Sequence, residues 1–240
     1  MTDIKERPIL FSAPMVRAIL EGRKTVTRRA IKPQPGSCDH SLWPNQPAPV
    51  WGMDPDESGW RCGICGNGMR MTKRTAVGIS CPYGKPGDRL WVRETWMDLR
   101  GTGVEHRPDS DGPLQRYAYR ADSPPGSHAD EARKYFGLKW KPSIHIPRVA
   151  SRILLEITEV RVERLQDISD EQAKAEGIIP HVRGGWHWHP HNPSNVDDWH
   201  QFGFKTPVWA FQDLWAGING QENWDANPWV WVVELKRVTP

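Results

Sequence analysis

Residues 9–29 read ILFSAPMVRAILEGRKTVTRR, and this stretch determines how the chain begins to fold. It predicts a short strand at Pro8–Phe11 and then a helix, because Ser12 is a good N-cap and Pro14 falls in the first turn, where its missing N–H costs little. Gly22 stands where a left-handed residue usually follows a helix. The apolar residues that fall on one face of this helix are Met15, Val16, Ile19 and Leu20.

The eight residues GRKTVTRR at 22–29 combine four cations with two hydroxyls. The β-branched residues favour an extended chain, so Arg23 and Lys24 are expected in the turn before a strand. One interpretation is a solvated strand with charge-paired arginines, because charge runs usually lie at the surface. In the other, partial burial beside the arginines lowers the pKa of Lys24, and the neutral amine activates the hydroxyl of Thr27. That interpretation needs Lys24 in the turn, since strand alternation would put positions 24 and 27 on opposite faces.

Farther along the chain, alternation and capping signals return at several places. A strand is predicted at Leu90–Trp96 after a Gly-Asp turn. Ser169 and Gln172 form a capping box that opens a helix at Asp170–Glu176, which Gly177 ends. The remaining predicted elements are a strand at Tyr117–Tyr119, a short helix at Asp130–Phe136, strands at Ile153–Ile157, Val160–Arg164 and Trp229–Leu235, and a helix that Thr206 caps and Pro207 begins.

The composition favours an α+β fold, with the 240 residues in a single domain. The 22 prolines and 21 glycines predict many turns and long connections, which do not suit a helical bundle. A net charge of +3 permits nucleic-acid binding without requiring it, and some of the 14 tryptophans could stack on bases. No apolar run approaches the roughly 18 residues of a membrane span, so we expect a cytoplasmic protein with no membrane partner.

Residues 30–85 interrupt the pattern with dense proline and glycine, which indicates an inserted segment rather than a core layer. Further loop insertions are expected at 100–145 and 180–205. The first insertion contains all four cysteines of the chain, Cys38, Cys62, Cys65 and Cys81. In a reducing compartment, the CGIC turn and two further thiolates predict a closed structural zinc site. Because the spacing is irregular, free or partly paired thiols are the alternative.

The segment 181–200 alternates histidine with tryptophan. Its histidines are His181, His187, His189, His191 and His200. Histidine-rich tracts can bind metal, but this alternation in a loop rich in proline and glycine is equally typical of a strand edge or a stacking surface.

Four stretches, taken in order, resemble the ASCH-domain proteins carried by bacteriophages and prophages. They are the segment at 9–29, PGDRLWVRETW at 86–96, ITEVRVERLQDISDEQAKAEGI at 157–178 and WVWVVELKRV at 229–238. GRKT, PGD with VRE, and a capped helix ending in Ala-Glu-Gly together make the resemblance specific. The insertions between the stretches have no counterpart in it.

This resemblance implies a PUA-like mixed β-barrel with flanking short helices and a cleft. In small bacterial members it also implies an amidohydrolase that removes the acyl group from N4-acylated cytosine nucleosides. Matched position by position, Lys24 becomes the proton acceptor, Thr27 the nucleophile and Glu176 the proton donor. Without the resemblance, Glu176 would be interpreted as an ordinary exposed helix glutamate. The reaction also needs positive charge near the oxyanion, which an arginine such as Arg29 could supply.

The resemblance also provides candidates for substrate binding, which are Arg23, Arg29, Arg93 and Glu94. A structural ion pair is the alternative for the last two. The expected substrate is an N4-acylated cytosine, free or within a nucleic acid. Two other functions stay open. One is a non-catalytic RNA- or DNA-binding module in which the cations at 23–29 contact phosphate and tryptophans stack on bases, and the other is a nuclease that uses the same basic cleft.

Overall fold

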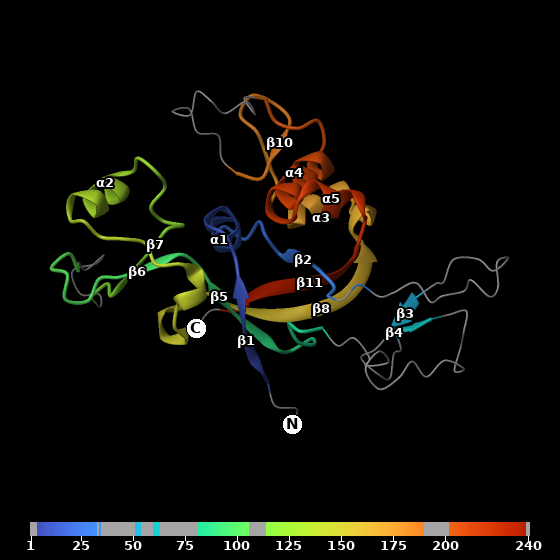
Figure 1. Cartoon of the computed structure of the whole chain (residues 1–240), viewed down its shortest axis with the longest axis horizontal. Helices are drawn as coiled ribbons and strands as arrows, with labels where there is room; N and C mark the ends of the chain where they lie inside the picture. The colour runs from blue at the N-terminus through green and yellow to red at the C-terminus, as the bar shows by residue number, and fades with distance from the viewer. Residues whose placement is uncertain are drawn as a thin grey trace.

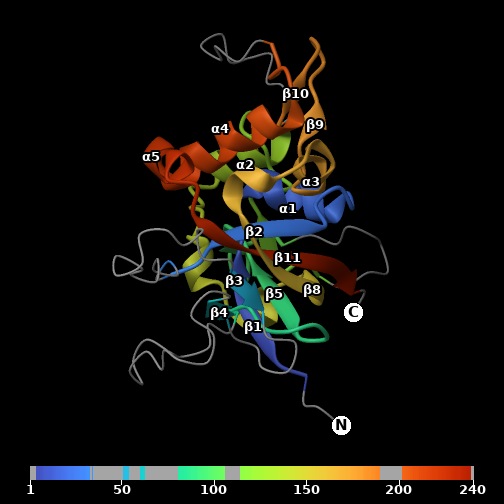
Figure 2. The same cartoon turned by 90° about the vertical axis from the view of Figure 1, so that its right-hand side faces the viewer.

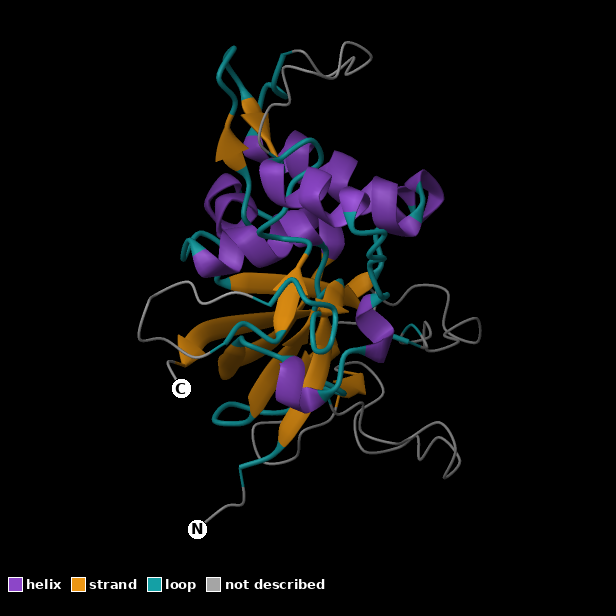
Figure 3. Ribbon diagram, turned by 90° about the vertical axis from the view of Figure 1, so that its left-hand side faces the viewer, coloured by secondary structure: helices purple, strands orange, loops and turns teal. Residues whose placement is uncertain are grey.

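The computed structural model describes residues 4–32, 34, 81–105, 114–189 and 202–238, together with the backbone of two short strands at 51–53 and 60–62. These residues form an α+β fold with several sheets, which confirms the predicted class. Figure 3 shows most of the helices gathered in a layer on one side of the strands. None of the described helices has the length and apolar character needed to cross a bilayer.

The main sheet has five strands. In spatial order they are β1 (Glu6–Leu10), β5 (Arg89–Arg93), β8 (Leu154–Arg164), β11 (Trp229–Val238) and β2 (Val26–Ala30). β1 and β5 are parallel, and every other pair of neighbours is antiparallel. The long strands β8 and β11 pair along their whole lengths and curve together, as Figure 1 shows. The run of Trp and Val in β11 suits this central place, because bulky and β-branched side chains pack well on a pleated surface.

The described residues contain the four helices that the sequence predicts and a fifth, at Gln221–Asp225, that was not predicted. The helices are α1 (Ala13–Leu20), α2 (His128–Tyr135), α3 (Asp170–Ala175), α4 (Pro207–Asn219) and α5 (Gln221–Asp225), with 3₁₀ turns at Ser143–His145, Arg148–Ala150 and Leu165–Asp167. Ser169 and Gln172 form the predicted capping box of α3, and the Thr206 hydroxyl accepts a hydrogen bond from the backbone N–H of Trp209. Ser12 occupies the N-cap of α1, but its side chain makes no capping hydrogen bond.

Alternation along β11 divides the core between the two faces of the sheet. Trp231 and Val233 pack in one cluster with residues of β1 and α1, among them Val16. Val230 and Val232 pack in a second cluster with residues of α3, α4 and α5. Figure 2 shows these three helices lying over the β2 and β11 side of the sheet. The face on which a β2 side chain lies therefore decides whether it meets α1 or α3.

Three two-stranded sheets complete the described strands. They pair β6 (Trp96–Asp98) with β7 (Tyr117–Tyr119), β9 (Ile179–Pro180) with β10 (Trp186–His187), and β3 (Trp51–Met53) with β4 (Trp60–Cys62). The predicted strand at Tyr117–Tyr119 is confirmed, and the helix expected at Asp130–Phe136 is present as α2. The described part of the loop expected at 180–205 includes β10, which pairs with β9.

Two predicted strand boundaries are wrong. The strands predicted at Ile153–Ile157 and Val160–Arg164 merge into one continuous strand, β8, which begins at Leu154. A register shift opposite Glu234 and Leu235 leaves Thr158 without a partner in β11 and absorbs the extra residue as a bulge. Conversely, the strand predicted at Leu90–Trp96 is interrupted after β5, because the chain leaves the main sheet and Trp96 pairs with Tyr119.

The described strands form an open sheet with β1 and β2 at its edges, and no closed barrel is found among them. The two edges nevertheless approach each other. The Arg29 guanidinium of β2 donates to the carbonyl oxygen of Leu10 at the end of β1, over 2.6 Å between Nη2 and O. A side chain thus bridges the edges where a closed barrel would have a backbone ladder, and the PUA-like barrel stays a prediction.

Candidate active site

The turn after α1 carries Lys24 into the interior. Gly22 has a φ of +75°, which is the left-handed conformation predicted for it. The backbone N–H groups of Arg23 and Lys24 then both donate to the carbonyl oxygen of Ala18, at 2.8 and 3.0 Å. Lys24 therefore lies in the turn before β2, where the hypothesis of a basic lysine requires it.

The Lys24 side chain meets Glu176, a residue 152 positions away. Nζ lies 2.5 Å from Oε2 of Glu176, 3.0 Å from that residue's backbone oxygen and 2.8 Å from the backbone oxygen of Val26. An ammonium has three protons, so these acceptors satisfy it completely. Both side chains are buried, with 0% and 3% of their surface exposed. Glu176 is therefore not an exposed helix glutamate.

Gly177 makes this close approach sterically feasible. Glu176 is the C-cap residue of α3, and Gly177 follows it with a φ of +104°. A Cβ at position 177 would lie 3.0 Å from the Cβ of Ala18 and 3.4 Å from that of Lys24. Any larger residue would push α3 away from α1, and with it the carboxylate from the amine.

Burial lowers the pKa of Lys24 from its ordinary value. Loss of hydration disfavours the charged amine and is the largest cause, and the positive charges of Arg29 and Arg28 act in the same direction. The Glu176 carboxylate opposes them by its charge and its hydrogen bond, but does not outweigh burial. The lowered pKa brings the amine nearer to the range in which a lysine can act as a base.

Thr27 lies on the opposite face of β2 from Val26 and Arg28. It pairs with Val233, a residue of the core cluster that packs against α1, and it is itself buried. Among the described residues, the Thr27 hydroxyl makes no hydrogen bond. Thr27 is connected to Lys24 through the preceding peptide group, because the carbonyl oxygen of Val26 accepts a hydrogen bond from Lys24 Nζ. The Lys24 amine therefore contacts the Glu176 carboxylate directly, and it contacts the backbone next to Thr27 rather than the Thr27 hydroxyl.

Arg28 is a member of this site that the sequence analysis did not single out. Its side chain is fully buried, and Nη2 donates to Glu163 and to Gln172, each over 2.9 Å. Nη1 lies 3.5 Å from Oε1 of Glu176, and neither of these two atoms has a hydrogen-bond partner among the described residues. A usable signal was present, because Gln172 and Glu176 are four residues apart and so share a face of α3.

The ring of Phe11 lies between two cations of this region. Lys24 Nζ is 5.7 Å from the ring centroid and Arg29 Cζ is 5.3 Å from it. Both distances allow a cation–π interaction, and the ring is almost completely buried. Phe11 was expected only as the end of a strand, because a sequence does not show which side chains a ring faces.

The remaining substrate-binding candidates lie outside the Lys24–Glu176 contact. Arg23 ion-pairs with Glu21 and donates over 2.9 Å to the carbonyl oxygen of Gly177. The Arg93 guanidinium stacks 5.1 Å from the ring centroid of Trp91. Glu94 is buried and receives two hydrogen bonds from Arg152, at 2.9 and 3.1 Å. Burial raises the pKa of Glu94, against the effect of Arg152. The ion-pair alternative thus describes Glu94 well.

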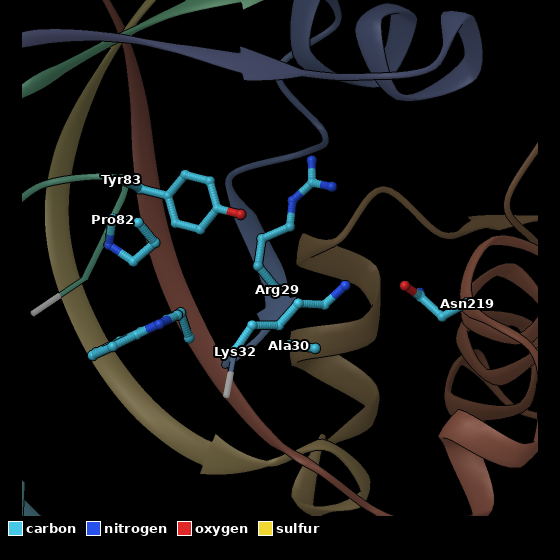
Figure 4. Close-up of a pocket in the computed structure, with 7 residues that line it drawn as sticks. Arg29, Ala30, Lys32, Pro82, Tyr83 and Asn219 are labelled. Atoms are coloured by element: carbon cyan, nitrogen blue, oxygen red, sulfur yellow. The ribbon is translucent and has the colours of Figure 1, made fainter. Parts of the chain in front are cut away.

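A half-open pocket of about 370 Å³ lies beside Arg29, and Figure 4 shows its lining. The lining residues are Arg29, Ala30, Lys32, Pro82, Tyr83, Asn219 and Trp231. Arg29 is the one predicted site residue among them, and the Lys24–Glu176 pair is buried away from it.

The zinc prediction falls mostly outside the described residues. Cys38 and Cys65 lie outside them, and of Cys62 only the backbone, in β4, is described. Cys81 is described as a half-buried free thiol whose pKa burial raises. Within the described part of the chain, no group of His, Cys, Asp or Glu is arranged to hold a metal ion. The zinc site therefore stays a prediction.

The described histidines of the 181–200 segment gather around His187, which is buried at the end of β10. The ring centroid of His187 is 3.9 Å from that of His189 and 5.9 Å from that of His181. His191 and His200 lie outside the described residues.

Comparison with known proteins does not identify the chain, since no family model, no curated protein and no solved structure matches it.

Proposed function

We propose that this protein is an amidohydrolase that removes the acyl group from an N4-acylated cytosine, with a PUA-like fold of the ASCH type. The observation that carries the proposal is the buried contact between Lys24 and Glu176, 152 residues apart in the chain. A buried amine against a buried carboxyl group can exchange a proton within the pair, and buried titratable groups with perturbed pKa values cluster at catalytic sites. Thr27 follows Val26, whose carbonyl oxygen accepts a hydrogen bond from Lys24, and it supplies a hydroxyl that makes no hydrogen bond among the described residues.

The proposed reaction begins when the resting Lys24 ammonium passes a proton to the Glu176 carboxylate, which leaves the Lys24 amine neutral. Lys24 accepts the hydroxyl proton of Thr27 while Oγ1 attacks the acyl carbon. The bond from that carbon to N4 of cytosine breaks, and Glu176 gives its proton to N4. The cytosine leaves as a free amine, and the acyl group stays on Thr27 as an ester.

Water completes the cycle. It attacks the ester carbon while the Glu176 carboxylate accepts one of its protons, and the Lys24 ammonium returns a proton to Oγ1 of Thr27 as the acid departs. This leaves the proton on Glu176, from which it returns to Lys24 and restores the resting ion pair. Because each partner gives up one proton for every one it gains, the site never holds two uncompensated charges, which suits its burial.

The two neighbouring arginines have different places in this scheme. Arg29 lies on the same face of β2 as Thr27, two residues further along, so its charge can act on a bound substrate from that face. Arg28 lies on the other face with Glu163 and Glu176. Its charge helps to lower the pKa of Lys24, so it favours the neutral amine that accepts the hydroxyl proton.

Threonine variants test the chemistry with little disturbance of the fold. Thr27→Val keeps the shape and removes the nucleophile, so hydrolysis of N4-acetylcytidine, followed by its ultraviolet absorbance, should fall by roughly 10³-fold or more. Thr27→Ser should retain far more activity than Thr27→Val. The matched control is Thr25→Val, since Thr25 is an exposed neighbour on the same segment and should be near wild type.

Two results would contradict the proposal. One is a wild-type protein that turns over none of several N4-acylcytosines, and the other is an equal loss of hydrolytic activity in Thr25→Val and Thr27→Val.

A second candidate function, a nucleic-acid-binding module, is favoured by the basic pocket at Arg29 and Lys32. Salt-sensitive oligonucleotide binding without turnover would favour it, and metal-independent cutting of a labelled oligonucleotide would indicate a nuclease instead.

A further inference from the structure

We propose that the pocket beside Arg29, which we call the Arg29–Lys32 pocket, binds the phosphate group of a nucleotide or nucleic-acid strand whose acylated cytosine reaches Thr27. The preferred substrate would then be phosphorylated rather than a free nucleoside or base. This inference rests on the proposed amidohydrolase function and adds to it the substrate class.

The two cations of the pocket are available to an anion. Among the described residues, neither Arg29 nor Lys32 forms an ion pair with a carboxylate. Arg29 uses Nη2 on the Leu10 carbonyl, while its Nε is buried without a hydrogen-bond partner in the described part of the chain. Lys32 is exposed and has no described contact of its side chain. An arginine fork and a nearby ammonium are the groups that proteins most often use to bind phosphate.

The other walls of the pocket suit the rest of a nucleotide. Tyr83 offers aromatic surface on which a base or sugar can pack, and Trp231, which is almost completely buried, forms part of the wall. In Figure 4 the Tyr83 hydroxyl points toward Arg29, and the Asn219 amide and the Lys32 amine point toward each other across the opening. A volume of about 370 Å³ lies within the range of small-molecule pockets.

The register of β2 and β11 relates this pocket to Thr27. Arg29 pairs with Trp231 and Thr27 pairs with Val233, so all four side chains lie on one face of the sheet. Two residues along a strand span about 7 Å. That is on the scale of the separation between base and phosphate within one nucleotide, so a phosphate at Arg29 leaves its base close to Thr27.

Binding measurements test the pocket without relying on catalysis. By titration calorimetry, cytidine 5′-monophosphate should bind about tenfold more tightly than cytidine. Lys32→Ala should remove most of this preference, and the matched control Lys236→Ala, which deletes an exposed lysine of β11 outside the pocket, should keep it. Equal binding of nucleotide and nucleoside, or equal losses in both lysine variants, would overturn the inference.

Turnover separates this inference from the function on which it rests. If N4-acetylcytidine and its 5′-monophosphate are hydrolysed with equal kcat/KM, the pocket assignment fails while the amidohydrolase stands. If the nucleotide binds with the expected preference but no acyl-cytosine is hydrolysed, the function fails and the phosphate site stands. A short single-stranded oligonucleotide with one N4-acetylcytosine completes the test, because a higher kcat/KM than for the mononucleotide identifies a polymer as the source of the phosphate.

Discussion

Replacing Glu176 by leucine should reveal how strongly the buried carboxylate holds Lys24. In Glu176→Leu the amine keeps two backbone acceptors and loses its counter-ion in a place where none of its side chain is exposed. A lone buried ammonium is costly enough that Lys24 should become neutral in the folded variant. A free lysine has a pKa of about 10.4, so deprotonating it at pH 7 costs about 1.36 kcal/mol for each of about 3.4 units, or about 4.6 kcal/mol.

The two remaining carbonyl acceptors make this figure an upper limit. The loss in free energy of unfolding at pH 7 should therefore be between about 3 and about 4.6 kcal/mol, which lies within the usual effect of removing one partner of a buried ion pair. Urea unfolding followed by tryptophan fluorescence measures it directly.

The pH dependence of this loss identifies its cause. In Glu176→Leu the unfolded chain binds a proton at Lys24 below pH 10 and the folded chain does not, so stability must rise with pH over that range. The slope should be about 1.4 kcal/mol per pH unit, and most of the loss should disappear by pH 9 to 10. A further change, Lys24→Met in the same chain, removes the titrating group, so the double variant should recover most of the stability and lose this slope.

Lys24→Met alone provides the matched comparison. It leaves Glu176 without the amine but with Arg28 Nη1 at 3.5 Å from Oε1, so it should cost less than Glu176→Leu. If the two single losses simply add in the double variant, and Glu176→Leu shows no added pH slope, then the two side chains are not a coupled buried pair and the assignment of Lys24 as a base is wrong.

Two further outcomes concern other parts of the chain. Burial alone would raise the pKa of Asp130, but the N–H of Gly126 and the side chains of Arg133 and Lys134 lower it to about 2. Its contribution to stability should thus be complete above about pH 4 and vanish toward pH 2, so the difference in melting temperature between wild type and Asp130→Asn should shrink over that interval. Metal analysis should find about one zinc per chain and markedly less in Cys81→Ser, and a wild-type content well below one equivalent would refute the predicted site.

The local signals in the sequence were reliable because they depend on neighbours a few residues away. The capping box of α3, the Thr206 cap of α4 and the left-handed Gly22 all appear where the residue types place them. The two errors in strand boundaries have a non-local cause. Whether β8 continues through Thr158 depends on a bulge against β11, and whether β5 continues depends on which strand Trp96 pairs with.

Arg28 illustrates why the site could be predicted only in part. The contact between Lys24 and Glu176 was expected from a resemblance, since nothing in the spacing of two residues so far apart brings them together. Arg28 stayed unnoticed because its surroundings come from β8 and α3, through Glu163 and Gln172. Alternation along β2 gives the face on which a residue lies, but only tertiary packing decides what that face meets.

The same alternation explains why the four cations of residues 23–29 lie in different surroundings. Arg23 lies at the surface beside Glu21, which fits the solvated interpretation of the run, whereas Lys24 and Arg28 are buried against carboxylates, which excludes that interpretation for them. Arg29 turns to the other face, toward Leu10, Phe11 and the pocket. Because consecutive strand residues point to opposite sides, Arg28 lies beside the buried Lys24–Glu176 pair while Arg29 faces the pocket, where we propose that it meets a substrate anion. A one-residue shift in the register of β2 would exchange these environments, which ties the proposed chemistry to the pairing of β2 with β11.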